Sequence, residues 1–366
     1  MRLLPLIAAL IAAIAVALAA GGARALTVAP DRVAQPEACP DGNPSALLRL
    51  DLSGPRPRSE QIASDIWRHG GYPLDVSPDG RWFLYSAGGK DLRVRPVAGG
   101  SSRLLATEPP GAYALKANWS PDGKRIAFVT ISGGGRTPLW VVGADGSGLQ
   151  KVADDGSVPT WSPDSRRLAF FRSRKRLIVT RADGSRSLDV APAFGPDGPP
   201  VWSPRGDWIA YPGIGARTLD LIRPDGSGHR VLGGGLYPSW APRGNRIVSN
   251  HVYNYDGGNA QDAFAIRDLH GHLLHSIEYG QALFPSWSPL DDQIVYAALA
   301  GKLHDGRDQL WSIRANGTRA HQLTHDRELP GIVLADDIER LEWVTKGPRT
   351  GKQLFYFRNF CDDDTD

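Results

Sequence analysis

The stretch Asn118-Trp119-Ser120-Pro121-Asp122-Gly123-Lys124-Arg125-Ile126-Ala127-Phe128 decides the fold. A tryptophan ends one apolar segment, a four-residue turn follows, and a second segment rich in β-forming residues begins. Proline presets the φ angle that the second position of a type I turn requires, and glycine suits the position that follows. Between two such segments, the turn predicts a β-hairpin.

The same turn occurs six times along the chain. Its prolines are Pro78, Pro121, Pro163, Pro204, Pro242 and Pro289, at separations of 43, 42, 41, 38 and 47 residues. A tryptophan precedes every turn except the first, where Val76 takes its place. Each unit also contains a second hairpin, closed by a Gly-rich turn such as 143–148. Four strands per unit, repeated about every 40 residues, are typical of a β-propeller.

A seventh unit is divided between the two ends of the chain. Residues 47–54 look like the second hairpin of a unit without the first, and residues 341–357 look like the first hairpin without the second. Joined, they complete a blade that closes the ring and removes the unpaired strand edges of an open array. We therefore expect an all-β fold, a seven-bladed β-propeller over residues 45–360, with a six-bladed ring as the alternative.

The two cysteines, Cys39 and Cys361, flank this shared blade. An even pair of cysteines in an exported protein usually forms a disulfide. A bridge here would replace the missing connection between the two hairpins and lock the ring. We predict a Cys39–Cys361 disulfide; two unrelated thiols are the alternative.

The N-terminus has the features of a signal peptide. A basic start precedes the apolar run 3–20, and Ala23 and Ala25 are the small residues that a signal peptidase requires. We expect cleavage after Ala25, an extension over 26–44 ahead of the propeller, and an acidic tail over 361–366. An uncleaved membrane anchor is the alternative, because the run is about as long as a bilayer-spanning helix. Either way, the protein is expected to be periplasmic or secreted.

The charge balance does not favour a nucleic-acid partner. The chain has 42 basic and 39 acidic residues, and removal of the signal peptide reduces the net charge from +3 to about +1. No block of lysine and arginine stands out, whereas nucleic-acid binding needs a concentrated basic face. We expect a monomer without a transmembrane segment after signal cleavage.

The repeat resembles the WD40-like repeat of the TolB propeller family. The resemblance rests on three features: the sequence Trp-Ser-Pro-Asp-Gly, the Lys/Arg-Arg-Ile-Ala-Phe sequence that follows it, and a Leu-Trp hairpin with Asp-Gly-Ser-Gly. It covers about residues 45–357. It implies a periplasmic propeller that binds other envelope proteins. The chain departs from the family in two ways: only residues 26–44 stand where TolB has an α/β domain, and the repeats count seven blades rather than six. The repeat also occurs in propellers of prolyl peptidases and oligogalacturonate lyases.

The repeated polar and aromatic residues are expected to be structural. The turn carboxylates Asp79, Asp122 and Asp164 are replaced by Arg or Leu in the next three units, which a catalytic or metal site would not tolerate. One tryptophan per blade is expected to pack between adjacent sheets. The cluster His270-Gly271-His272, with His275 nearby, falls on an outer turn and is interpreted as a polar turn rather than a metal site.

Long loops on one face provide the candidate site. In a propeller, the second-to-third strand connections and the connections between blades lie on the face opposite the regular turns. The longest additions, 251–262, 299–308 and 325–339, belong to neighbouring blades, and loops on a rigid scaffold usually carry binding function. The candidate ligand- or partner-binding residues are His251, Tyr253, Asn254, Tyr255, Asp256, His304, Asp305, Arg307, His325, Asp326, Arg327 and Asp336.

Two functions fit this loop face. The first is a non-catalytic scaffold that binds envelope or secreted proteins and needs no cofactor. The second is a polysaccharide lyase-like enzyme or carbohydrate-binding protein. There, by resemblance to oligogalacturonate lyases, His251, His304 and His325 would hold a divalent metal beside Asp256 or Asp305. A variable surface without a ligand is the remaining interpretation of the loops.

Overall fold

The structure is a computed structural model in which the chain divides into two units, Met1–Pro40 and Asp41–Asp366. Only parts of the second unit are described here. They are residues 45–54, 56–63, 72–87, 91–107, 113–131, 137–193, 198–214, 218–251, 263–278, 282–299, 308–324, 332–333, 338–359 and 361–362. The predicted signal peptide and the whole N-terminal extension, residues 26–44, therefore lie outside the described residues.

The second unit contains seven four-stranded antiparallel sheets, numbered here as blades 1 to 7. Blade 1 consists of β3 (Tyr72–Val76), β4 (Trp82–Ala87), β5 (Asp91–Pro96) and β6 (Arg103–Thr107). Blade 2 consists of β7 (Tyr113–Trp119), β8 (Arg125–Ile131), β9 (Leu139–Gly143) and β10 (Gln150–Ala153). Blade 3 consists of β11 (Ser157–Trp161), β12 (Arg167–Arg172), β13 (Arg176–Arg181) and β14 (Leu188–Pro192).

Blades 4 to 6 repeat this order. Blade 4 consists of β15 (Val201–Trp202), β16 (Ile209–Pro212), β17 (Thr218–Ile222) and β18 (Arg230–Gly234). Blade 5 consists of β19 (Leu236–Trp240), β20 (Arg246–His251), β21 (Ala263–Asp268) and β22 (Leu273–Glu278). Blade 6 consists of β23 (Ala282–Trp287), β24 (Gln293–Leu299), β25 (Asp308–Arg314) and β26 (His321–Gln322).

Blade 7 closes the ring with strands from both ends of the chain. Its order is β28 (Ile338–Trp343), β29 (Gln353–Asn359), β1 (Ser45–Asp51) and β2 (Arg58–Ala63). The register between β1 and β29 runs without a shift from Ser45 opposite Asn359 to Asp51 opposite Gln353. Because β28 also contacts β23 and β1 contacts β3, blade 7 joins blade 6 to blade 1. Seven blades are confirmed, and the shared closing blade with them.

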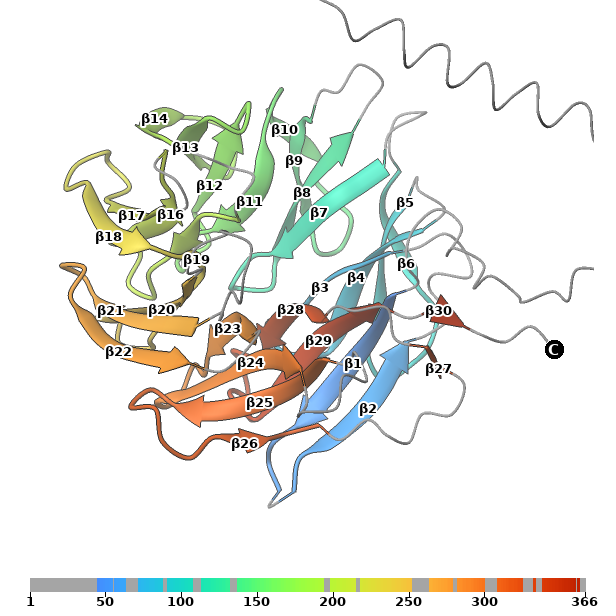
Figure 1. The fold of residues 1–366 in the computed structure, drawn as a ribbon. Helices are drawn as coiled ribbons and strands as arrows, with labels where there is room; N and C mark the ends of the chain where they lie inside the picture. Colours follow the sequence, from blue (N-terminus) through green and yellow to red (C-terminus); the bar gives the residue numbers. More distant parts are fainter. Residues whose placement is uncertain are drawn as a thin grey trace, which may run out of the picture. The chain divides into compact units, whose positions relative to one another are not determined.

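The first strands of the blades lie at the centre of the ring, as the positions of β7, β11, β19, β23 and β28 in Figure 1 show. A separate two-stranded sheet pairs β27 (Ile332–Val333) with β30 (Cys361–Asp362). The described residues contain no helix, and so no helix able to cross a membrane occurs among them.

The predicted proline turn closes the first hairpin of blades 1 to 6, with alanine in place of serine in blade 5. In blade 2, the Gly123 amide donates to the Ser120 carbonyl at 2.8 Å, and the Ser120 hydroxyl donates to Asp122 at 2.5 Å. Burial raises the pKa of Asp122, but hydrogen bonds from Ser120 and Lys124 and the nearby Arg125 outweigh it, so the net pKa is lowered. In blade 4, Asp207 accepts the equivalent serine hydroxyl bond instead. The turn carboxylate is therefore structural.

Tryptophan side chains connect adjacent blades. The indole N–H of Trp161 donates to the Asn118 carbonyl at 3.0 Å, and that of Trp240 donates to the Val201 carbonyl at 3.1 Å. Arginines from the preceding blade stack on two of the tryptophans: Arg125 lies 5.0 Å from the Trp161 ring centroid, and Arg167 lies 4.9 Å from that of Trp202. Buried side chains of neighbouring blades form joint clusters, so the hydrophobic core lies between the sheets.

Candidate functional site

The predicted loop residues are mostly outside the described part of the chain. Of the candidates, only His251 is described, as the last residue of β20, where it pairs with Ala263 of β21. The other eleven lie outside the described residues, so their clustering stays a prediction. Among the described residues, no three histidine, cysteine or acidic side chains are grouped so that they could hold a metal ion.

The histidine cluster of blade 5 forms a turn. Asp268 accepts the backbone N–H groups of His270 and His272 and contacts His272 Nδ1 at 2.8 Å. Burial raises the pKa of Asp268, but the hydrogen bonds from His272 and His270 outweigh this effect, so the net pKa is lowered. These contacts account for the cluster as a polar turn.

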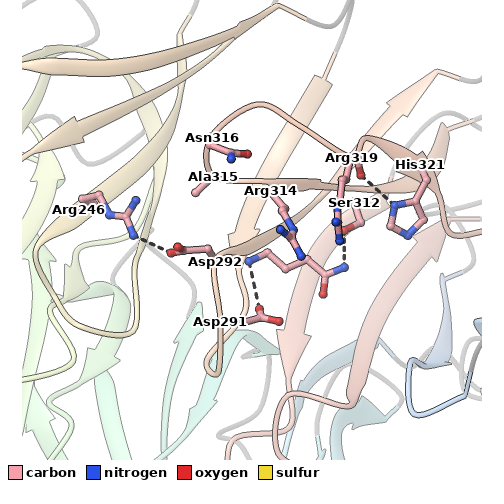
Figure 2. A pocket seen from close by; sticks show the side chains of 10 residues that line it. Arg246, Asp291, Asp292, Ser312, Arg314, Ala315, Asn316, Arg319 and His321 are labelled. Carbon is pink, nitrogen blue, oxygen red and sulfur yellow. Dashed lines mark hydrogen bonds and ion pairs between the residues drawn. The ribbon is translucent and has the colours of Figure 1, made fainter.

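A shallow pocket of about 450 Å³ lies on the regular-turn face of blade 6 (Figure 2). Arg246 reaches it from blade 5 and pairs with Asp292 at 2.6 Å, while Asp291 accepts the Gln293 amide. Arg246 also lies 5.1 Å from the Trp287 ring centroid. These contacts repeat the arginine–tryptophan packing seen between other blades, so this pocket is explained by blade assembly.

A cavity of about 410 Å³ lies at the centre of the ring; we call it the central channel. Six blades line it, each with its first strand or with a residue just before that strand. Its wall is dominated by aliphatic, aromatic and proline side chains. The lining residues are Lys116, Asn118, Val158, Pro159, Thr160, Pro199, Val201, Tyr237, Pro238, Ser239, Phe284, Pro285, Ser286 and Leu341. Its volume suits one or two large side chains of a ligand.

Three residues of the channel wall have strained backbones. Val158, Tyr237 and Phe284 have φ angles of 43°, 51° and 51°, in the left-handed region that bulky residues rarely adopt. Each stands three residues before the blade's tryptophan, precedes a proline, and falls where the strand register shifts. Such β-bulges redirect side chains, and strain of about 1–3 kcal/mol per residue is typically kept where function needs it.

The aromatic pair Tyr237 and Phe284 is presented by these bulges. Their ring centroids are 4.9 Å apart at an interplanar angle of 68°, an edge-to-face arrangement. Tyr237 remains 37% exposed. Because the hydroxyl of Thr160 donates to the Pro200 carbonyl and that of Ser239 accepts the Trp287 amide, polar groups of the wall are engaged within the protein. The channel therefore offers an apolar, aromatic surface.

The sequence signal for this wall was missed. It is the tripeptide Pro-Ser/Thr-Trp at 159–161, 238–240 and 285–287. A proline two residues before a strand-ending tryptophan interrupts the strand ladder, because proline has no N–H to donate. These prolines stand before the tryptophan, whereas the proline turn that defines the repeat stands after it.

A second cavity, of about 870 Å³, adjoins the channel and shares Lys116 and Val158 with it. It lies where the second-to-third strand connections of blades 2 and 3 meet the connection between those blades. Asp155 ties them together by accepting bonds from the Thr137 hydroxyl at 2.9 Å and the Ser173 amide at 2.9 Å. The channel thus continues into a recess of mixed aliphatic and polar lining on the face opposite the regular turns.

Comparisons with known proteins agree with this architecture. No protein-family model matches the chain. An uncharacterized protein of Agrobacterium fabrum is 26% identical over 292 residues, which cover 73% of this chain and 85% of that protein. The Tol-Pal system protein TolB of Anaeromyxobacter dehalogenans is 37% identical over 106 residues, but these span only 27% of this chain and 21% of that TolB.

Solved structures share the fold at low sequence identity. An Agrobacterium tumefaciens structure described as a TolB has a TM-score of 0.50 at 17% identity and covers 87% of this chain and 99% of its own. An oligogalacturonate lyase in complex with manganese has a TM-score of 0.57 at 15% identity, covering 87% and 98%. The chain is a seven-bladed β-propeller. Part of its repeat region is similar in sequence to TolB proteins, and its fold is shared by solved propellers that include a TolB structure.

Proposed function

We propose that the protein is an exported, non-catalytic propeller that captures another envelope or secreted protein in its central channel. The observation that carries the proposal is the Tyr237–Phe284 pair, held on strained bulges in an apolar wall. Exposed aromatic side chains in a pocket are typical anchors of protein–protein binding. The similarity to TolB proteins supports a partner in the cell envelope.

The size of the channel limits what it accepts. A cavity of about 410 Å³ accommodates a projecting loop or a short peptide segment rather than a folded domain. The bulges fix the two rings before binding, so little side-chain entropy is lost when a partner enters. We therefore propose recognition of an extended segment that places an apolar side chain against the Tyr237–Phe284 pair.

The loops predicted from the sequence belong to the same proposal. Residues 252–262 join β20 to β21, residues 300–307 join β24 to β25, and the segment after β26 leads to β28. All leave the described strands at the face opposite the regular turns. We propose that they extend the binding surface around the channel and that no metal is required.

A photo-crosslinking experiment tests the proposal. A benzophenone amino acid replaces Phe284, and a second version replaces Leu290, which is 58% exposed on the regular-turn face. Irradiation in the native envelope should give one dominant protein adduct from position 284 and none from position 290. Adducts of equal yield and identity from both positions, or none from position 284, would overturn the proposal.

A further inference from the structure

One short segment of the chain is strongly basic. It runs from Arg172, the last residue of β12, through the turn 173–175 to Arg176, the first residue of β13; we call residues 172–176 the basic hairpin. The net charge of the whole chain does not reveal this segment, because the chain has nearly equal numbers of acidic and basic residues. In the structure the four cations are concentrated on one turn.

The charge of the basic hairpin is largely uncompensated. Arg176 pairs with Asp189 at 2.8 Å. Arg172, Arg174 and Lys175 are exposed, and no carboxylate of the described residues lies within ion-pair distance of them. Asp155 lies against the hairpin, where it accepts bonds from the Ser173 amide and hydroxyl, and Asp154 pairs with Lys151 at 2.6 Å. Among the described residues, the tip therefore carries three cations without an ion pair above one carboxylate, Asp155, at its base.

The backbone holds these charges in a fixed geometry. Ser173 and Arg174 have φ angles of 51° and 56°, and the Lys175 amide donates to the Arg172 carbonyl at 3.0 Å. Two consecutive residues with positive φ are typical of a type I′ turn, a position that Asn and Gly normally occupy. The hairpin thus keeps an arginine at a strained site, as functional segments often do.

The basic hairpin borders the recess that adjoins the channel. Ser173 and Arg174 line the 870 Å³ recess, which shares Lys116 and Val158 with the central channel. A segment bound against Tyr237 and Phe284 could therefore continue through the recess toward the basic hairpin. The path runs from the aromatic pair, through a recess lined by both aliphatic and charged side chains, to the basic hairpin.

We propose that the basic hairpin selects a partner segment that carries carboxylates beside its apolar channel-binding side chain. This inference rests on the proposed capture of a protein in the channel. Arginine donates in a fork that matches a carboxylate, and exposed charges at the rim of a site set partner choice and association rate. An acidic peptide fits better than an acidic glycan, because most of the channel wall consists of aliphatic, aromatic and proline side chains.

A selection from a random peptide library tests the inference. The bait proteins are the wild type, the triple variant Arg172→Gln, Arg174→Gln and Lys175→Gln, and the channel variant Tyr237→Asn with Phe284→Asn. Asparagine tolerates positive φ, so the channel variant should keep its bulges. The matched control is Arg166→Gln, Arg181→Gln and Arg186→Gln, which removes three exposed arginines from the regular-turn face of the same blade.

The wild type and the control should select peptides in which Asp or Glu flanks an aromatic or aliphatic residue. The hairpin variant should select apolar peptides without acidic enrichment, and bind a wild-type-selected peptide about ten-fold more weakly, a loss that the control does not show. Unchanged melting temperatures would exclude misfolding.

Other outcomes overturn the inference in distinguishable ways. Apolar peptides without acidic enrichment on the wild type would refute the hairpin's role and leave channel capture intact. Acidic peptides that bind the channel variant as tightly as the wild type would refute channel capture as its basis. Selection of no peptide, with direct binding of oligogalacturonate, would refute both in favour of an anionic glycan.

Discussion

Ser45, at the start of β1, lies opposite Asn359, at the end of β29, in the closing blade. The two ends of the propeller sequence therefore meet at one end of the inner strand pair of blade 7. Cys361 follows Asn359 by two residues, and Cys39 precedes Ser45 by six. Cys361 therefore follows the end of β29 closely, whereas Cys39 lies outside the described residues, and the pairing of the two cysteines stays a prediction.

We predict a Cys39–Cys361 disulfide in the exported protein. Replacing both cysteines with serine should lower the free energy of unfolding by about 2–4 kcal/mol, because the bridge restricts the unfolded chain across almost the whole propeller. Intact-mass measurement after alkylation without reduction counts the free thiols directly. Modification of both cysteines would contradict the prediction.

Removal of one arginine between blades should destabilise the ring. Arg246 stacks on Trp287 and pairs with Asp292, so Arg246→Ala is expected to lower the free energy of unfolding by about 1–2 kcal/mol. Arg243→Ala, three residues earlier on an exposed turn, is the control and should change it by less than about 0.5 kcal/mol. Equal losses in urea denaturation would contradict this account of the interface.

Stability should fall in acid because of the turn carboxylates. Although burial raises the pKa values of Asp122 and Asp164, hydrogen bonds from Ser120 and Ser162 contribute to a net lowering in the folded state. A lowered folded pKa stabilises the fold above the unfolded value, near 3.9, and this stability is lost as pH falls through the folded pKa. The double variant Asp122→Asn and Asp164→Asn should therefore lose less melting temperature than the wild type between neutral pH and about pH 3. A parallel loss in both proteins would show that these carboxylates do not contribute.

The fold could be predicted from local chemistry. The turn around Pro121 specifies its own hairpin, and its copies at a regular interval require a ring. Comparing the copies also separated structure from function, since Asp122 is replaced by Arg205 and Arg243 at equivalent turns.

The candidate site was harder to predict because it depends on backbone geometry. In a regular strand, alternation would fix which side chains face the channel. The bulges at Val158, Tyr237 and Phe284 break this alternation. The basic hairpin was visible in the sequence, but its position beside the channel follows only from the arrangement of blades 2 and 3.

Removal of one predicted loop should separate binding from stability. Replacing residues 252–261 with a short Gly-Ser linker is expected to abolish partner capture, while the melting temperature stays within about 3 °C of the wild type. The residual strands β20 and β21 are already paired through six residue pairs. A large fall in melting temperature would mean that the loop is structural.

The purified protein should contain no stoichiometric metal. If the loop histidines His251, His304 and His325 held a divalent ion, as in the alternative function, elemental analysis would find about one equivalent per chain after dialysis. Retention of one equivalent of manganese or calcium, lost on His251→Ala, would favour that alternative over the proposed scaffold.

The most direct test of the central claim is the affinity of the crosslinked partner for the channel variant. The partner identified at position 284 is purified, and its dissociation constant is measured by calorimetry for the wild type and for Tyr237→Asn with Phe284→Asn. Loss of two aromatic anchors should weaken binding by about a hundred-fold or more, with the far-ultraviolet circular dichroism unchanged. An affinity within about two-fold of the wild type would contradict capture in the channel, because the loss of anchor residues costs far more binding free energy than that.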